Sequence, residues 1–479
     1  KKSKNKTAEQ NLEYKINVIR REFSDGVIII DEAHHINSDN IDKRLVTKVL
    51  SDVLLYSKNC RLILLTATPM FDKPSNIVSL LNYLLINDKR SPLPFTIFDK
   101  EGYKMTPKGI KLLAEKSRGY ISYLRGNNPF TFPTTLSSKT NIPSQILNLK
   151  KYPKIPAIFK DLNHEMRFLE IVSSPMGKIQ KSVYQKVLNN KNATAWTEES
   201  QVSNFVYQSL EETDGQTINC YGKNGFKKMF NPRIGGKNSS YTFKNEEEGK
   251  KFSENLSEYS SKIANIIKII KESSKRGPIF IYSFYVESGL KPLVIALEMA
   301  GFLPYKSHNT PYIKNKYKNK EYQGDYIIKT GSVDEFTVKH SNINKYLSMR
   351  QSMVKEENVK IFLGSQSASE GLSLFGYREI HILEPHFNLS MLQQAIGRTI
   401  RTGSHLHLPL EERNATVYMH ASTLPKEETV DLYKYRTAEK KAIYSGLVEK
   451  ILKENSIDCH VNLHGNLFDD KLLYKDINM

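Results

Sequence analysis

Two adjacent carboxylates follow a short apolar run near the start of the sequence. The segment from Gly26 to Asn37 reads GVIIIDEAHHIN, so Asp31 and Glu32 come directly after four apolar residues. An unbroken β-branched run of this length predicts a strand buried on both faces, as in a parallel sheet covered by helices. Open α/β sheets bind ligands at the carboxyl ends of their strands. There, one carboxylate can hold Mg²⁺ through water while the other orients an attacking water, as hydrolysis of a phosphoanhydride requires.

A second predicted strand brings hydroxyl groups to the same kind of edge. A helix-compatible stretch from Ile41 to Leu55 is followed by the apolar run Arg61 to Leu65, which leads into Thr66-Ala67-Thr68-Pro69. Threonine hydroxyls can hydrogen-bond phosphate, water or a neighbouring carboxylate, and the proline ends the strand. Taken alone, the acidic pair also fits a buried strand that ends in a polar loop with a capping aspartate. The order strand, helix, strand and hydroxyl pair favours a catalytic edge.

Two arginines near residue 400 have the spacing expected of a phosphate site. Gln394, Gly397, Arg398 and Arg401 fit the pattern QxxGRxxR, after a predicted strand and the segment SQSASEGLSL. On a helix, residues four apart share a face, so Gln394 would lie beside Arg398 and Gly397 beside Arg401. A guanidinium stays charged and bridges phosphate oxygens, which stabilises the charge that develops on a transferred phosphoryl group.

Together, DEAH, TAT and QxxGRxxR resemble motifs II, III and VI of the superfamily 2 helicases and translocases. The resemblance implies that Asp31 binds Mg²⁺ and that Glu32 is the catalytic base for ATP hydrolysis. It implies that His34, with Thr66 and Thr68, couples hydrolysis to contact with nucleic acid. Gln394, Arg398 and Arg401 complete the catalytic set.

Further residues are implied in the second half of the chain. The strand Ile279 to Ser283 corresponds to motif IV, which places Ser283 near a nucleic-acid backbone, and Ser365 has a similar role. The nucleotide-binding residues that the resemblance implies are Glu370, Gly371 and Gly397. Ser373 departs from the pattern, because many relatives have Asp or Asn there, and the ribose contact of that position is left unassigned.

Several stretches are similar to a narrower group, the helicases of large nucleocytoplasmic DNA viruses. This group includes the poxvirus nucleoside triphosphatase I and the small subunit of the early transcription factor. The similar stretches are Arg118 to Pro133, Ile171 to Leu188, Gln201 to Phe230 and the ending that begins at Ser456-Ile457-Asp458-Cys459. The resemblance implies a role in viral transcription, viral RNA polymerase or transcription factor subunits as partners, and the host cytoplasm or the virion as location.

Composition narrows the classes of function. Lys and Arg exceed Asp and Glu by 70 to 51, a net charge of +19, which favours a polyanionic partner such as nucleic acid. A bias toward Lys, Asn and Ile in the source genome would explain the same excess.

The three cysteines are far apart and form no CxxC pair, which argues for a reducing compartment and against a zinc site. No apolar run reaches the roughly 18 residues of a membrane helix, so we expect a cytoplasmic protein without membrane contact.

The expected fold is α/β, with two RecA-like parallel-sheet domains in tandem. At 479 residues the chain is too long for a single core. We expect the C-terminal part of a first, DEAH-containing domain at 1–135, an α-rich linker and insertion at 136–258, and a second domain with a helical tail at 259–479. ATP would be hydrolysed between the two domains.

The phosphate-binding loop of the family is missing from the printed sequence. Lys178 and Lys237 each follow a glycine, but neither belongs to GxxxxGK[ST], the pattern whose backbone N–H groups wrap phosphates. We therefore expect both to be surface lysines, the first domain to lack its N-terminal strands, and this chain alone to be inactive. Two alternatives remain open: a catalytically silent nucleic-acid-binding scaffold, and the motor subunit of a restriction or remodelling complex. Among nucleic acids, DNA is favoured over RNA.

Overall fold

The computed structural model describes residues 8–37, 41–123, 131–160, 162–190, 196–207, 220–232, 240–273, 277–305, 311–314, 321–330, 359–366 and 372–461. By its internal contacts the chain divides into two units. The first contains Lys1–Arg125 and Lys440–Met479, and the second is Gly126–Glu439. The expected linker and insertion at 136–258 thus lies within the second unit, and the end of the expected second domain lies within the first.

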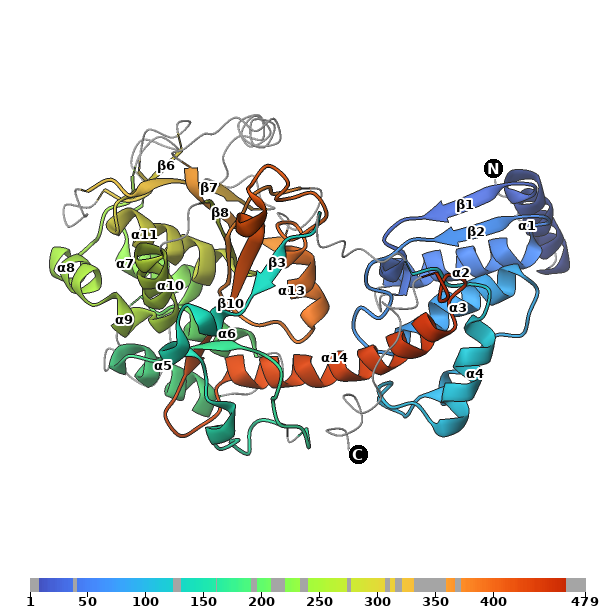
Figure 1. Cartoon of the computed structure of the whole chain (residues 1–479), viewed down its shortest axis with the longest axis horizontal. Helices are drawn as coiled ribbons and strands as arrows, with labels where there is room; N and C mark the ends of the chain where they lie inside the picture. The colour runs from blue at the N-terminus through green and yellow to red at the C-terminus, as the bar shows by residue number, and fades with distance from the viewer. Residues whose placement is uncertain are drawn as a thin grey trace. The chain divides into compact units, whose positions relative to one another are not determined.

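The first unit contains a two-stranded parallel sheet and helices, of which α2 (Ile41–Tyr56) and α3 (Asn76–Asn87) pack on one face of the sheet (Figure 1). Strand β1 is Val27–Ile30 and β2 is Arg61–Leu64, with Val27 opposite Arg61 and Ile30 opposite Leu64. The helices are α1 (Ala8–Phe23), α2 (Ile41–Tyr56), α3 (Asn76–Asn87) and α4 (Pro107–Ser117). The inner face of the sheet packs against Leu54 of α2 and against Leu80 and Tyr83 of α3. Both strands and both central helices lie where the apolar patterns predict them.

The other face of this sheet is exposed, which corrects one prediction. Val27 and Ile29 of β1 are 58% and 62% exposed, and Ile63 and Leu65, in and just after β2, are 44% and 48% exposed. Side chains alternate between the two faces of a strand, and among the described residues helices pack on only one of these faces. The prediction that β1 is buried on both faces is therefore wrong for the part of the chain that the structure describes.

A second apolar cluster in this unit joins segments far apart in sequence. Val448 and Leu452 of α14 (Val430–Glu454) pack with Leu81 and Leu85 of α3 and with Leu113 of α4. Arg118 Nε also donates to Asn455 Oδ1 at 3.0 Å. The C-terminal half of α14 is therefore part of the first unit.

The second unit is built on a larger sheet in which every described pairing is parallel. The strand order is β3-β10-β9-β5-β8-β7-β6. Strand β4 pairs with the later residues of β10, Met419 to Thr423, after the part of β10 that pairs with β3. The strands are β3 (Thr134–Leu136), β4 (Ile171–Pro175), β5 (Ile279–Tyr282), β6 (Phe302–Pro304), β7 (Gly324–Lys329), β8 (Val359–Gly364), β9 (Glu379–Ile382) and β10 (Asn414–Thr423). The chain is therefore of the α/β class, with parallel sheets of the kind found in RecA-like domains, as predicted.

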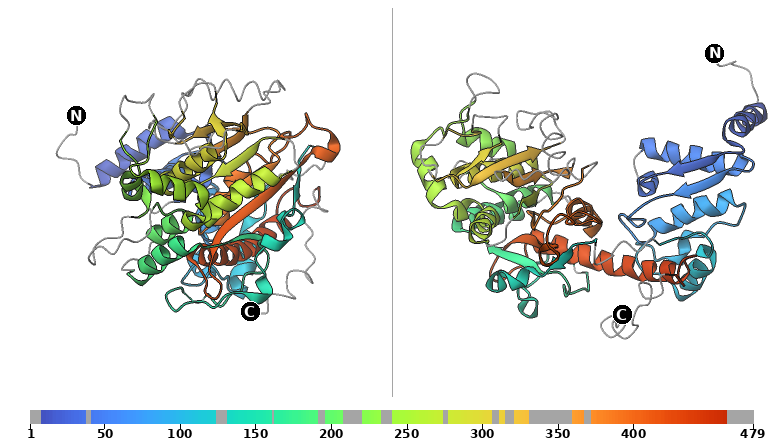
Figure 2. Two further views of the ribbon diagram at one scale, coloured as in Figure 1. Left: turned by 90° about the vertical axis from the view of Figure 1, so that its left-hand side faces the viewer. Right: turned by 45° about the horizontal axis from the view of Figure 1, so that its top comes forward.

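Helices from the middle and the end of the sequence surround this sheet, some packed on it directly and others on neighbouring helices (Figures 1 and 2). They are α5 (Lys178–Asn189), α6 (Thr197–Asn204), α7 (Gly222–Met229), α8 (Glu246–Glu254), α9 (Leu256–Tyr259), α10 (Ser261–Glu272), α11 (Lys291–Met299) and α13 (Leu389–Ile396). The expected insertion contributes Phe205, Phe226 and Phe252 to the same core as the central strand residue Phe280. This segment is thus part of the folded domain. No helix in the described ranges is both long and apolar enough to cross a bilayer.

Candidate functional site

The acidic pair lies in a tight turn at the carboxyl end of β1. Glu32 has a φ of 49°, in the left-handed region that few residues with a Cβ adopt. Asp31 Oδ1 accepts a hydrogen bond of 2.8 Å from the Glu32 backbone N–H, and Ala33 N–H donates to Leu65 O at 2.9 Å. These contacts hold the turn, and both carboxylates remain exposed to solvent. Strained backbone of this kind is concentrated at functional sites.

His34 links the acidic turn to the end of the neighbouring strand. Its buried ring has Nδ1 at 2.8 Å from Thr66 Oγ1, 3.4 Å from Thr68 Oγ1 and 3.4 Å from Glu32 Oε2. The ring also stacks on Phe71, with centroids 5.1 Å apart. Around His34 the structure therefore brings together Glu32, Thr66 and Thr68, and Asp31 is next to Glu32 in the same turn. Phe71, two residues after Pro69, was not predicted, because a lone aromatic after a strand has no distinctive spacing.

The acidic pair fits the requirements of a magnesium site. Mg²⁺ prefers carboxylate oxygens and keeps several waters, so a single exposed carboxylate beside a nucleotide is sufficient. In the described residues Asp31 has no cationic partner, and its contact with the Glu32 N–H uses only one oxygen. Asp31 is therefore the residue best placed to hold the metal, and Glu32 remains available next to it.

The arginine pair lies beyond the end of a helix. Helix α13 contains Gln394 but ends at Ile396, and Gly397 occupies its C-cap position. The prediction that Gly397 and Arg401 share a helical face is therefore wrong, because the regular helix ends before Arg398. Gly397 stays in the right-handed region, with φ −63° and ψ −10°, and the N–H groups of Arg398 and Thr399 donate to the carbonyls three residues back, so the last turn is tighter than the helix.

Neither arginine is neutralised by a carboxylate among the described residues. The exposed Arg401 donates from Nη1 to Ser373 Oγ at 2.6 Å, and the half-buried Arg398 has a buried Nε without a partner. Two other arginines in this unit do form ion pairs, Arg378 with Glu412 and Arg436 with Glu428. Among the described residues, the charges of Arg398 and Arg401 are therefore not compensated by a carboxylate and remain available to an anionic ligand.

The two predicted nucleic-acid serines of the second unit are both buried. Ser283, just after β5, has its Oγ 3.0 Å from both carboxylate oxygens of Glu384, which follows β9. The backbone N–H of Phe284 also donates to Glu384. Ser365, after β8, is buried, and its N–H donates to Lys329 O at 3.1 Å. In this conformation the hydroxyl of Ser283 is therefore hydrogen-bonded to the Glu384 carboxylate and is not exposed to solvent.

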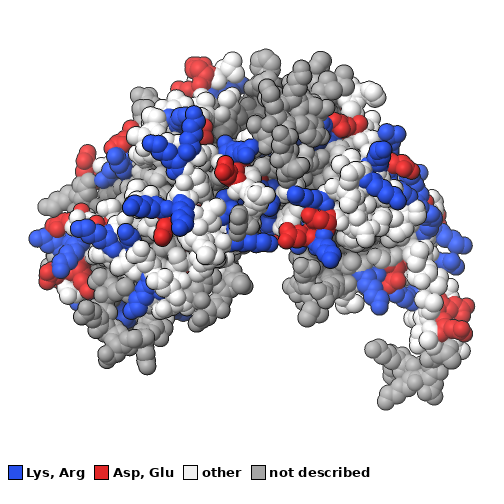
Figure 3. Space-filling view, turned by 90° about the horizontal axis from the view of Figure 1, so that it is seen from below, with Lys and Arg blue, Asp and Glu red and all other residues white. Residues whose placement is uncertain are grey.

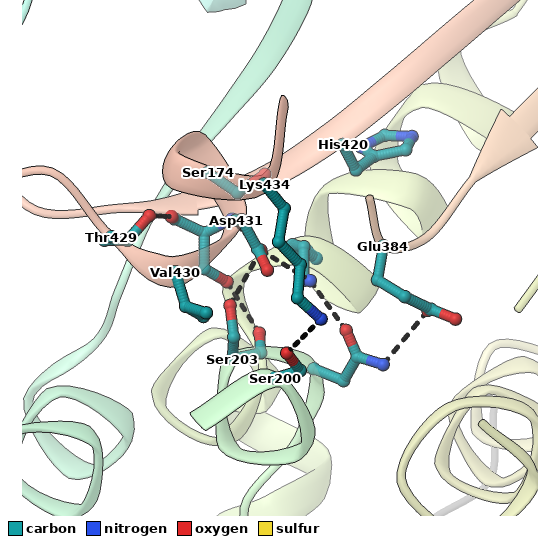
Figure 4. Close-up of polar contacts among 12 residues, drawn as sticks. Ser174, Ser200, Ser203, Glu384, His420, Thr429, Val430, Asp431 and Lys434 are labelled. Carbon is teal, nitrogen blue, oxygen red and sulfur yellow. Dashed lines mark hydrogen bonds and ion pairs between the residues drawn. The ribbon is translucent and has the colours of Figure 1, made fainter. Parts of the chain in front are cut away.

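Glu384 belongs to a buried polar network that also includes charged residues from α10 and α14. Lys262 Nζ lies 2.7 Å from Asp431 Oδ2 and 2.6 Å from Asn204 Oδ1, and Asn204 Nδ2 donates to Glu384 at 3.0 Å. Figure 4 shows Asp431, Ser203, Lys434 and Glu384 in this arrangement. Burial raises the pKa of Glu384, although Lys262 acts in the opposite direction. The network fixes the loop after β5, and it was missed because neither Lys262 nor Glu384 belongs to a recognised spacing.

Several predicted positions lie elsewhere. Glu370, Gly371 and Lys237 are outside the described residues. Lys178 is exposed at the first turn of α5, as expected for a surface lysine. Figure 3 shows Lys and Arg scattered among Asp and Glu on the face that it draws, without a continuous basic stripe among the coloured residues.

Comparisons with known proteins agree with the motifs. Residues 2–71 match the family model described as "Type III restriction enzyme, res subunit". A protein of Acanthamoeba polyphaga mimivirus, "Putative ATP-dependent RNA helicase L377", is 28% identical over 93% of this chain and 42% of its own length. An African swine fever virus protein, "Termination factor NPH-I homolog", is 26% identical over 91% of this chain and 63% of its own length. A solved structure, the C-terminal part of the Fun30 ATPase domain, covers 41% of this chain and 55% of that one at 14% identity, with a TM-score of 0.26.

The predicted resemblance is thereby confirmed. The chain is similar, over more than nine tenths of its length, to helicases of large nucleocytoplasmic DNA viruses. It spans less than two thirds of the length of either of these viral relatives.

Proposed function

We propose that this chain, as a relative of the viral helicases, is the motor portion of an ATP-dependent nucleic-acid helicase or translocase. The observation that carries the proposal is the arrangement around His34. Nδ1 of this buried ring contacts both the Glu32 carboxylate and the hydroxyls of Thr66 and Thr68, at the carboxyl ends of two adjacent parallel strands. Such an arrangement gives a hydrolytic carboxylate a direct connection to a second segment of the chain.

The charged residues of the three motifs, Asp31, Glu32, Arg398 and Arg401, each have a role in the proposed ATP hydrolysis. Glu32 accepts a proton from the attacking water, which requires an exposed carboxylate with room beside it for water. Asp31 holds Mg²⁺, which when bound neutralises charge on the nucleotide phosphates. Arg398 and Arg401 stabilise the charge that grows on the transferred phosphoryl group, and Gln394 orients the same turn.

The nucleic-acid partner is proposed to be bound mainly through its phosphates. Contacts of this kind position a protein without strong dependence on base sequence. Cycles of nucleotide binding and release would change the conformation of the motor and move it along the strand. We propose DNA as the favoured partner, a role in viral transcription with polymerase or factor subunits, and action in the host cytoplasm or the virion.

We also propose that residues 1–479 alone do not hydrolyse ATP. The printed sequence contains no GxxxxGK[ST], so the backbone N–H groups and lysine that normally wrap the phosphates are missing. Several charge-assisted hydrogen bonds worth about 1.5–3 kcal/mol each would be lost, which corresponds to more than a hundredfold in affinity. Calorimetry of this chain with Mg·ATP should show little or no binding. Micromolar binding would mean that other residues hold the phosphates, and Lys178 and Lys237 would be the first to replace.

The decisive experiment uses a longer chain that includes a GxxxxGK[ST] segment. Glu32→Gln keeps the size of the side chain but removes the base, so ATP should still bind while turnover falls by at least about a hundredfold. Glu13→Gln, on the exposed surface of α1, is the matched control and should leave turnover unchanged. If Glu32→Gln retains most of the hydrolysis rate, the catalytic role of Glu32 is wrong. Absence of hydrolysis in the unmodified longer chain would instead favour the catalytically silent scaffold.

A further inference from the structure

Three hydrogen bonds join residues 373–376 to residues 398–404, the segment that contains the two motif arginines. Arg401 Nη1 donates to Ser373 Oγ at 2.6 Å, Leu374 N–H donates to Arg398 O at 2.8 Å, and Gly376 N–H donates to Ser404 O at 2.8 Å. The two backbone contacts set the distance between the segments. The side-chain contact then determines where the guanidinium of Arg401 lies.

The chemical nature of this partner matters. An aspartate at residue 373 would form an ion pair with Arg401, and an incoming phosphate would have to displace it. The serine hydroxyl accepts a hydrogen bond but carries no charge, so most of the guanidinium N–H donors and its full positive charge remain available. Arg401 is exposed, and its long side chain would otherwise occupy many rotamers.

We infer that Ser373 is a positioning residue for Arg401, which rests on the proposed role of that arginine in ATP hydrolysis. The hydroxyl restricts the guanidinium before the phosphate arrives, without competing with the phosphate for its charge. Preorganised charge of this kind lowers the barrier of the chemical step more than it improves ground-state binding. The serine that departs from the family pattern is thus an alternative means of orienting the motif arginine.

The kinetic test uses the longer, hydrolysing chain. Ser373→Ala should lower kcat about fivefold to tenfold with KM within about twofold, because the arginine acts mainly in the transition state. Ser373→Thr keeps the hydroxyl and should stay within about twofold of the unmodified protein. Ser373→Asp should be slower than Ser373→Ala at low salt and should recover partly as salt screens the new ion pair. The control is Ser390→Ala on α13, a serine without a hydrogen bond among the described residues, which should change neither parameter.

Two further measurements separate positioning from a structural effect and from failure of the proposed function. In residues 1–479, the Arg401 guanidinium N–H resonances should be separately resolved by NMR and should merge in Ser373→Ala. Unchanged resonances would overturn the inference. If Arg401→Ala leaves hydrolysis unaffected, both the role of the arginine and the inference fail. If Arg401→Ala abolishes hydrolysis while the Ser373 variants behave as the unmodified protein, only the positioning role is wrong.

Discussion

His34 and Thr66 are hydrogen-bonded through Nδ1 and Oγ1 at 2.8 Å, so the segments that follow β1 and β2 are linked side chain to side chain. The same threonine oxygen accepts the N–H of Thr68 at 3.1 Å. A change in backbone position at the end of either strand can therefore be transmitted to the end of the other strand through the imidazole ring of His34.

The first prediction concerns this link in the longer, hydrolysing chain. Thr66→Val keeps the shape of the side chain but removes the hydroxyl that contacts His34. Stimulation of ATP hydrolysis by nucleic acid should fall about tenfold, while the unstimulated rate should stay within about twofold. Steady-state hydrolysis with and without single-stranded DNA measures both quantities. Thr66→Ser keeps the hydroxyl and should retain the stimulation. Equal stimulation in both variants would remove the coupling role from this contact.

The second prediction concerns the excess of positive charge. If the net charge of +19 serves phosphate binding, affinity for DNA should fall about tenfold or more between 50 and 200 mM salt. Fluorescence anisotropy with a labelled oligonucleotide measures this dependence. An oligonucleotide with an uncharged methylphosphonate backbone is the control and should bind poorly at every salt concentration. A flat salt dependence, or no binding at low salt, would support the alternative that the lysines reflect genome composition.

The third prediction concerns the buried ion pair of Lys262 and Asp431. Lys262→Met leaves the carboxylate of Asp431 buried without its cation, which should lower the free energy of unfolding by about 3–5 kcal/mol. The pair of Lys251 and Glu247 on α8 is exposed, so Lys251→Met should change stability by less than about 1 kcal/mol. Urea unfolding followed by circular dichroism compares the two. Similar stability of both variants would show that Asp431 finds another partner or becomes protonated.

The fourth prediction concerns acid sensitivity. Burial lowers the pKa of His405 to about 4, against the effect of its hydrogen bond to Tyr377 O. A histidine in the unfolded chain has a pKa of about 6.5, so between these values the unfolded state binds a proton that the folded state does not. The stabilising contribution is complete above pH 6.5 and is lost as the pH falls toward 4, with a total on the order of 3 kcal/mol.

Unfolding of residues 1–479 across this pH range tests the assignment. His405→Gln can still donate to Tyr377 O but does not titrate, so the pH dependence of its stability should be weaker by up to about 1.4 kcal/mol per pH unit. His460→Asn, at an exposed position, should keep the full pH dependence. An unchanged slope in His405→Gln would assign the acid sensitivity to other groups. The pKa of His420 is also lowered by burial and acts in the same direction, so part of the slope should remain.

Local patterns were sufficient to predict most elements that carry the candidate site. The strands β1, β2, β5 and β9 lie where β-branched runs occur, and α10 lies where isoleucines recur at helical spacing. The contact of His34 with Thr66 also follows from position, because the carboxyl ends of adjacent parallel strands meet at one edge. These features depend on residues close together in sequence or on the rules of parallel sheets.

The remaining features depend on contacts that no local pattern encodes. Whether both faces of β1 are buried depends on which elements cover the sheet, and only one face is covered by described residues. The aromatic residues Phe205, Phe226 and Phe252 join the core from a segment without clear periodicity. Ser283 was expected at a nucleic-acid surface because of its motif, whereas its burial results from Glu384, about a hundred residues further along the chain.

The exposed face of the β1 and β2 sheet has a consequence for how sequence variation there should be understood. Val27, Ile29, Ile63 and Leu65 add little to the core of the first unit, since their side chains project away from α2 and α3. Replacing them with polar residues of similar shape therefore costs this unit little folding free energy. If natural variants nevertheless retain apolar residues at these four positions, selection must act through a contact other than those among the described residues. A survey of variation across the two faces of one small sheet would thus distinguish residues kept for folding from residues kept for association.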